Sequence, residues 1–131
     1  MRLLLDTHTF LWAISEPGKI PPTARSAIES TANSLFVSAV SLWEISIKTS
    51  LGKLDLNWDD DLIITASSAG MTTFPLEPDE AATYDQLTED THFDPFDRML
   101  IWQAIQRRLT LVSGDAAFRA FAKDGLKLLW K

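Results

Sequence analysis

Five short apolar runs recur along the chain, each of strand length rather than helix length. They occupy residues 2–5, 35–37, 72–74, 109–112 and 126–130. Continuous apolar runs of this kind are typical of strands that are covered on both faces, as in parallel sheets. The pattern therefore predicts a central parallel sheet of about five strands.

The segments between these runs have helical periodicity or helix-start signals. They are the segment after Asp6 and residues 21–32, 38–51, 58–69, 77–87, 94–108 and 115–125. Strands separated by helical crossovers predict an α/β fold with helices on both faces of the sheet. The chain has no internal repeat and no linker long enough to divide it, so residues 1–131 are predicted to form a single domain.

The composition of the chain limits the kinds of site that it can contain. The chain is 46% hydrophobic and 23% charged, which is typical of a globular protein. It has no cysteine, so only oxygen and imidazole ligands remain for a metal, and a thiolate nucleophile is excluded. The net charge of −6 argues against a large nonspecific surface for nucleic acid. No signal peptide and no apolar run of membrane-spanning length is found, which predicts a cytoplasmic protein with no membrane contact.

Two predicted strands end in aspartates. Asp6 follows the run at 2–5, and Asp115 follows the run at 109–112 through Ser113 and Gly114. Ligands of open parallel sheets bind beyond the carboxyl ends of the strands, which makes both aspartates candidates for a site. Each could instead be the N-cap of the helix that follows it, a frequent role of aspartate.

Glu44 lies on an otherwise apolar helical stripe, within the predicted helix 38–51. The stripe contains Val40, Glu44, Ile47 and Leu51. An exposed i,i+4 pair with Lys48 is the alternative, and it would contribute only a few tenths of a kcal/mol. We favour the buried position, and an acid on a burying stripe needs a partner.

Asp94 and Asp97 begin the predicted helix 94–108. Asp94 precedes Pro95, a sequence typical of an N-cap followed by the first helical residue. Asp97 could complete a capping box or favour the helix dipole. It also shares a stripe with Ile101, Ala104 and Arg108, so we interpret Asp94 as a cap and Asp97 as pointing inward.

Asp6, Glu44, Asp97 and Asp115 are thus expected to converge. Four carboxylates that lie close together cannot all stay ionised without a cation, because each raises the pKa of the others. Mg²⁺ or Mn²⁺ prefers such oxygen ligands. A site of this kind activates water and stabilises the leaving oxygen in phosphodiester hydrolysis.

Four ordered blocks of sequence also carry a family resemblance: LLLDTHTFLW, VSAVSLWEISIKTSLGKL, HFDPFDRMLIWQA and LVSGDAAF. Along essentially its whole length the chain resembles the PIN-domain ribonucleases, and within them the VapC toxins of bacterial toxin–antitoxin pairs. The resemblance implies a three-layer α/β/α sandwich and Mg²⁺-dependent cleavage of RNA. It assigns the metal to the same four acids, and to Asp97 rather than Asp94. It further implies a small cognate antitoxin, a segment of which enters the acidic groove, and a homodimer.

The resemblance leads to one mechanism and two alternatives. In the mechanism, Asp6, Asp97 and Asp115 hold one or two ions, and Glu44 holds or orients the attacking water or a second ion. The alternatives are a catalytically idle interaction module of the same fold and a structure-specific DNA nuclease. Gly114 departs from the family, because many relatives carry a larger or basic residue there, which leaves the grip on substrate near Asp115 open.

Weaker assignments concern the polar neighbours of the four acids. Thr7, Ser38 and Ser113 are candidates to orient the carboxylates, although capping and strand-end turns explain them nearly as well. Lys48, Lys53 and Arg98 are candidates for contacts with phosphate, whereas Arg107 and Arg108 suit the end of a helix and need no ligand. For His8 the alternatives are a contact with substrate or a proton shuttle and a polar surface residue, and we favour the surface residue because a lone histidine in a loop is usually one. Of five tryptophans, including Trp12, Trp43, Trp58 and Trp102, some mark either an interface groove or simply the core.

Overall fold

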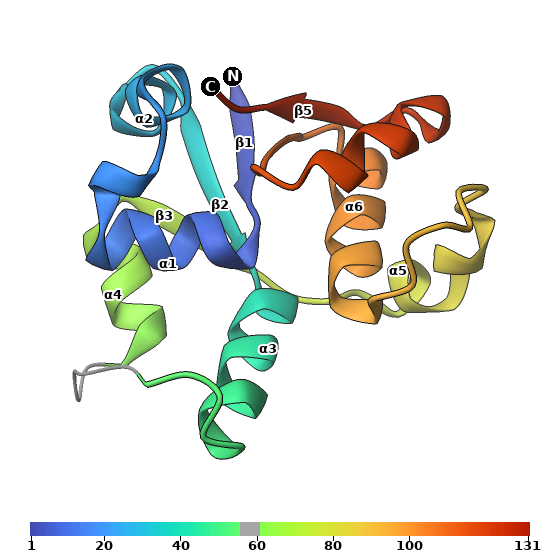
Figure 1. Cartoon of the computed structure of the whole chain (residues 1–131), viewed down its shortest axis with the longest axis horizontal. Coiled ribbons are helices and arrows are strands. Elements are labelled where there is room, and N and C mark those ends of the chain that lie inside the picture. Colours follow the sequence, from blue (N-terminus) through green and yellow to red (C-terminus); the bar gives the residue numbers. More distant parts are fainter. Residues whose placement is uncertain (56–60) are drawn as a thin grey trace.

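A computed structural model describes residues 1–55 and 61–131 and has a five-stranded sheet at its centre (Figure 1). Every neighbouring pair of strands is parallel, in the order β3-β2-β1-β4-β5. The strands are β1 (Arg2–Leu5), β2 (Ser34–Ser38), β3 (Met71–Phe74), β4 (Thr110–Val112) and β5 (Lys127–Leu129). The predicted parallel sheet of five strands is confirmed.

Helices connect the strands. They are α1 (Thr7–Ser15), α2 (Pro22–Glu29), α3 (Ala39–Ser50), α4 (Leu62–Ser68), α5 (Pro78–Thr83) and α6 (Pro95–Arg107), with 3₁₀ segments η1 (Pro17–Lys19), η2 (Tyr84–Gln86) and η3 (Ala116–Asp124). The helix predicted over 58–69 begins at Leu62, after Asp61 caps it, and residues 58–60 lie outside the described residues. The last predicted helix, 115–125, is a 3₁₀ helix.

Alternating side chains of β1 divide the core into two layers. Leu3 and Leu5 belong to one hydrophobic cluster and Leu4 belongs to the other. Helices α1, α2 and α4 contribute to the first cluster with Phe10, Ala24 and Ala66, among others. Helix α6 and η3 contribute to the second with Ile101, Trp102, Ala104, Phe118 and Phe121. This arrangement confirms the expected α/β/α sandwich.

The order in which strands are added to the sheet reverses between β1 and β4. Strands β2 and β3 lie on one side of β1, and β4 and β5 lie on the other side. Open α/β sheets bind ligands at such a switch point, beyond the carboxyl ends of the strands. Two hydrogen bonds to the carbonyl of Val112 join the two strand ends there, from the backbone N–H of Asp6 at 3.2 Å and the hydroxyl of Thr9 at 3.1 Å.

A buried network of hydrogen bonds connects α5 to α6. Glu80 is 5% exposed, and its carboxylate accepts hydrogen bonds from Arg107 Nε at 2.7 Å and Gln103 Nε2 at 3.0 Å. The Arg107 guanidinium also lies 3.8 Å from the centre of the Phe74 ring. Arg107 lies in the last turn of α6, as the sequence predicted, and the structure adds a partner within the protein, Glu80.

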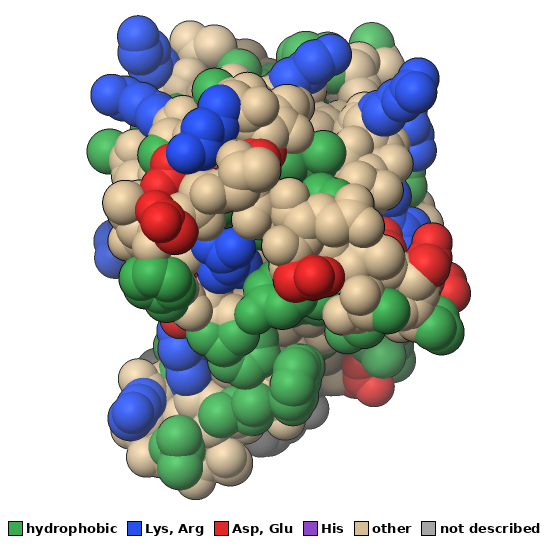
Figure 2. Space-filling model, turned by 90° about the vertical axis from the view of Figure 1, so that its right-hand side faces the viewer, with side chains coloured by type: hydrophobic (Ala, Val, Ile, Leu, Met, Phe, Trp, Pro, Cys, Tyr) green, Lys and Arg blue, Asp and Glu red, His purple; other side chains and the backbone are tan. Residues whose placement is uncertain are grey.

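Hydrophobic side chains gather in the lower half of the face shown in Figure 2. An apolar cavity of about 220 Å³ lies between α3, α5 and α6, and its lining includes Trp43, Tyr84 and Phe96. Trp43 is 58% exposed, which matches an interface residue, whereas Trp102 is 6% exposed and belongs to the core. Trp58 lies outside the described residues. Among residues 1–55 and 61–131, no helix is long and apolar enough to cross a membrane.

Candidate active site

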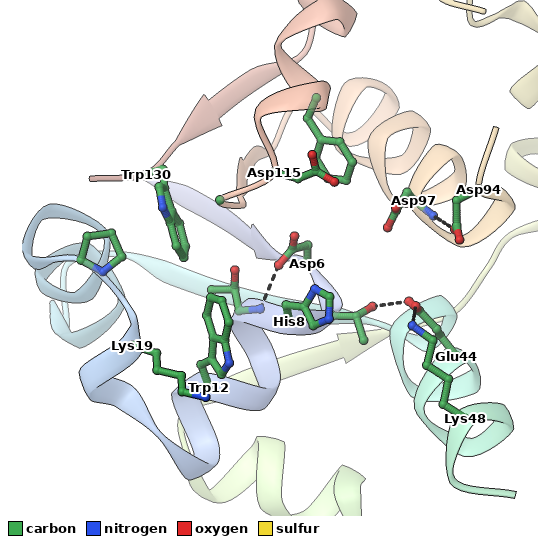
Figure 3. A pocket seen from close by; sticks show the side chains of 15 residues that line it. Asp6, His8, Trp12, Lys19, Glu44, Lys48, Asp94, Asp97, Asp115 and Trp130 are labelled. Carbon is green, nitrogen blue, oxygen red and sulfur yellow. Dashed lines mark hydrogen bonds and ion pairs between the residues drawn. The ribbon is translucent and has the colours of Figure 1, made fainter. Parts of the chain in front are cut away.

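A cavity of about 760 Å³ opens at the carboxyl ends of β1 and β4 (Figure 3). Five carboxylate residues line it: Asp6, Glu44, Asp94, Asp97 and Asp115. They come from the end of β1, from α3, from the start of α6 and from the end of β4. The structure thus brings all four predicted acids to one cavity, together with the predicted cap Asp94.

Asp6 both caps a helix and faces the cavity. It is the N-cap of α1, with Oδ1 accepting the backbone N–H of Thr9 at 2.9 Å. Only 6% of the residue is exposed. The cap and the site were alternatives for the sequence, and one carboxylate allows both, because the cap uses only one of its oxygens.

Asp115 has the same double position after β4. Its Oδ1 accepts the backbone N–H of Ala117 at 2.9 Å, so it caps η3. The hydroxyl of Ser113 accepts the backbone N–H of Asp115 at 3.1 Å. Ser113 therefore acts on the backbone that carries the carboxylate and does not contact the carboxylate itself.

Glu44 is buried and held at both of its oxygens. The hydroxyl of Thr7 donates to Oε1 at 2.6 Å, and the ammonium of Lys48 lies 2.6 Å from Oε2. The pair with Lys48 does form, but its carboxylate is only 5% exposed. The hydrogen bond with Glu44 raises the pKa of Lys48. Thr7 therefore contacts one of the predicted acids and lies in position to orient it.

Asp97 lies at the third position of α6, and its backbone N–H donates to Asp94 Oδ1 at 2.9 Å. Asp94 is thus the N-cap that the sequence predicted. Burial raises the pKa of Asp97 to about 6, and the nearby Asp94 and Glu44 add to this rise. His92 opposes the rise, since its Nε2 lies 3.0 Å from Asp97 Oδ2. Sequence reasoning missed His92, although it stands five residues before Asp97.

Three side chains are close enough to share a cation. His92, Asp97 and Asp115 each offer one ligand atom, and these atoms all lie within 4.8 Å of one another. Asp6 and Glu44 line the same cavity. The pKa of Asp97 is raised mainly by burial and further by the nearby Asp94 and Glu44, while the ammonium of Lys48 is paired with Glu44. The carboxylates around the cavity fit a hard divalent ion, which prefers oxygen ligands.

Two of the weaker candidates, Ser38 and Arg98, have other contacts in the structure. The buried hydroxyl of Ser38 donates to Gln103 Oε1 and caps α3, so it contacts none of the four acids. The guanidinium of Arg98 donates to the backbone carbonyls of Glu89 at 2.7 Å and His92 at 3.0 Å, so it is not directed at a phosphate in the cavity. It instead holds the segment that carries His92. Lys48 lines the cavity.

We expect the Asp97→Asn variant to be more stable than the wild type by about 1 to 2 kcal/mol at pH 7.5 without metal. The pKa of Asp97 is about 6 in the native chain, whereas the pKa of an aspartate in the unfolded chain is about 3.9. The native chain therefore binds this proton more tightly. The wild type therefore loses stability as the pH rises from about 4 to about 6, and the variant does not.

Urea denaturation in EDTA at pH 4.5 and 7.5 measures this difference. The advantage of the variant should be small at pH 4.5 and full at pH 7.5. Asp94→Asn serves as the control, because asparagine also caps helices well. An advantage of the same size at both pH values would contradict the raised pKa.

Comparisons with known proteins give a family and a set of solved structures of similar fold. The model of the PIN domain matches residues 3–124. The chain is 30% identical to "Ribonuclease VapC22" of Mycobacterium tuberculosis over 133 residues, which cover 98% of each protein. Among solved structures, VapBC2 of Rickettsia felis bound to a promoter DNA fragment aligns with a TM-score of 0.74 at 18% identity, over 100% of both chains. FitAcB of Neisseria gonorrhoeae aligns with a TM-score of 0.59 at 19% identity, over 97% of this chain and 96% of that one.

Proposed function

The chain belongs to the PIN-domain family, and on this basis we propose that it is a metal-dependent endoribonuclease that acts as the toxin of a toxin–antitoxin pair. The observation that carries the proposal is the convergence of Asp6, Asp97 and Asp115, with Glu44, in one cavity at the switch point of the sheet. The similarity to a ribonuclease over 98% of each chain supports RNA as the substrate.

Asp97 and Asp115, together with Asp6, would hold Mg²⁺ or Mn²⁺. Support comes from the short separation of the Asp97 and Asp115 ligand atoms and from the raised pKa of Asp97, which a divalent cation would lower. When bound, such an ion lowers the pKa of a coordinated water and stabilises the leaving oxygen of a phosphodiester.

The remaining polar groups position the reactants. Glu44 is fixed by Thr7 and Lys48, which suits it to orient a water beside the aspartates and to accept its proton. The Lys48 side chain is 42% exposed, so its ammonium can also meet a phosphate oxygen of the substrate. His92 holds one oxygen of Asp97 and so fixes the direction of the other.

We propose a small antitoxin protein as the partner. The solved structures of similar fold include VapBC and FitAB assemblies, which supports a partner of this type. An antitoxin segment with an arginine would suit the acidic cavity, because a guanidinium pairs well with carboxylates. The exposed Trp43 and the apolar cavity beside it support a protein interface, and we assign that surface to a homodimer.

Purified chain incubated with total RNA tests the proposal. We expect cleavage with Mg²⁺ or Mn²⁺ and none with EDTA, and fragments whose ends can be mapped by sequencing. The thermal midpoint should also rise with added Mn²⁺, because an ion that binds only the native chain stabilises it. No cleavage together with an unchanged midpoint would indicate an idle interaction module, and cleavage of DNA in preference to RNA would indicate a DNA nuclease.

A further inference from the structure

An aromatic wall bounds the cavity on the side away from Asp97. We use this name for His8, Trp12 and Trp130. The rings of His8 and Trp12 are stacked, with centroids 6.0 Å apart and planes at 21°, and Trp130 continues the row 6.2 Å from Trp12. All three residues line the cavity, and Figure 3 shows Trp12 and Trp130 on one side of Asp6 with Asp97 on the other.

Both indole rings of the wall are held in place by packing. Trp12 lies on α1 and Trp130 follows β5, and both pack against the first hydrophobic cluster while remaining partly exposed. Each therefore presents an apolar ring to the cavity without the cost of ordering a mobile side chain. Within the described part of the chain, Trp102 donates its indole N–H to Thr83, whereas the N–H groups of Trp12 and Trp130 have no such acceptor.

Gly114 makes room for the wall beside Asp115. A Cβ at this position would lie 2.7 Å from the Cε2 and Cζ2 atoms of Trp130, closer than van der Waals contact allows. The indole of Trp130 thus fills the place of a side chain on residue 114, directly next to a proposed metal ligand. The sequence left open what contacts substrate at position 114, where many relatives carry a larger or basic side chain. In this structure the ring of Trp130 occupies that space.

A cationic side chain lies beside the wall. The ammonium of Lys19 lies 6.0 Å from the centre of the Trp12 ring and lines the cavity, and its pair with Glu16 at 3.0 Å is exposed to solvent. Flat aromatic faces beside a cation are the combination that binds single-stranded nucleic acid, in which bases stack and phosphates meet lysine. The wall borders Asp6 and Asp115, so a base bound there would belong to a nucleotide next to the scissile phosphate.

We propose that the aromatic wall is a stacking site for one unpaired nucleobase flanking the cleaved phosphodiester, with Trp12 as its main contact. The site rests on the proposed ribonuclease function and adds a requirement to it: the substrate must be single-stranded at this nucleotide. The indole N–H groups then contact the base or its ribose, and Lys19 contacts a neighbouring phosphate.

A double-mutant cycle tests the site. Short oligoribonucleotides containing a mapped cleavage site are made intact and with a single base removed at each flanking position. We expect Trp12→Ala to lower kcat/KM for the intact oligonucleotide by about tenfold, mostly through KM, and Trp12→Phe to recover most of the loss. On the oligonucleotide that lacks the stacked base, Trp12→Ala and wild type should be equal.

Two controls separate the possible failures. Ile64→Ala removes an exposed apolar side chain of α4, outside the cavity, and should leave kcat/KM unchanged. The rise in thermal midpoint with Mn²⁺ should be the same in Trp12→Ala as in the wild type. Equal kcat/KM for Trp12→Ala and Ile64→Ala, with the wild type active, would overturn the stacking site alone. A wild type that cleaves no RNA would overturn the proposed function and the stacking site together.

Discussion

Replacing Asp97 with asparagine is expected to lower the rate of RNA cleavage by about 10³-fold or more, whereas Asp94→Asn should lower it less than about tenfold. Both aspartates line the cavity, but their carboxylates are engaged differently. Asp94 accepts the backbone N–H of Asp97, a bond that asparagine can also accept. Asp97 offers its carboxylate to the group it forms with His92 and Asp115, and an amide there would be a poor ligand for a divalent cation.

Initial rates at saturating Mg²⁺ with a short RNA measure the difference. Loss of activity in Asp97→Asn cannot be ascribed to unfolding if the variant proves more stable than the wild type without metal, as its raised pKa predicts. If Asp94→Asn abolishes cleavage as completely as Asp97→Asn does, the division of roles between the two aspartates is wrong.

Replacing Arg107 with methionine is expected to lower the free energy of unfolding at pH 7 by about 3 kcal/mol or more. The change leaves the Glu80 carboxylate, which is 5% exposed, without its charged partner. Burial alone would raise the pKa of Glu80, but hydrogen bonds from Arg107, the Glu77 backbone and Gln103 outweigh it and lower that pKa. Methionine retains much of the apolar contact, so the loss reports mainly on the charge.

Urea denaturation across pH checks this expectation. The lowered pKa means that the pair stabilises the native chain above about pH 4.5, and that this contribution is lost as the pH falls through the folded pKa. The deficit of Arg107→Met should therefore shrink in acid, where Glu80 takes up a proton. Arg119→Met, at an exposed arginine, should stay within about 0.5 kcal/mol of the wild type. A deficit equally small in Arg107→Met would show that the pair contributes nothing.

The strands were predictable because their signal is local. Residues 3–5 are continuously apolar, and β1 contains them behind the exposed Arg2, with Leu3, Leu4 and Leu5 fully buried. The type of the last helix was less predictable. The segment 115–125 carries a helical stripe that includes Phe118 and Phe121, yet it folds as a 3₁₀ helix, a choice between helix types that periodicity does not resolve.

The acids of the site were predictable for the same reason, since strand ends and helix starts are visible in sequence. Their partners were not, because each contact joins residues far apart in the chain. Thr7 and Glu44 are 37 positions apart, and Arg107 and Glu80 are 27 apart. Arg98 was assigned to phosphate from its place beside Asp97, but its guanidinium turns to the backbone of the preceding loop. The direction of a long side chain is decided by tertiary packing.

The hydrogen bond from Thr9 to Val112 spans 103 positions and joins the ends of β1 and β4. A ribosome makes Asp6 long before it makes Asp115, which can join Asp6 only after the residues between them have been added. Nascent chains and fragments from interrupted translation carry at most part of the acidic cavity. The complete set of carboxylates in the cavity therefore comes together only after β4 has been synthesised and has paired with β1.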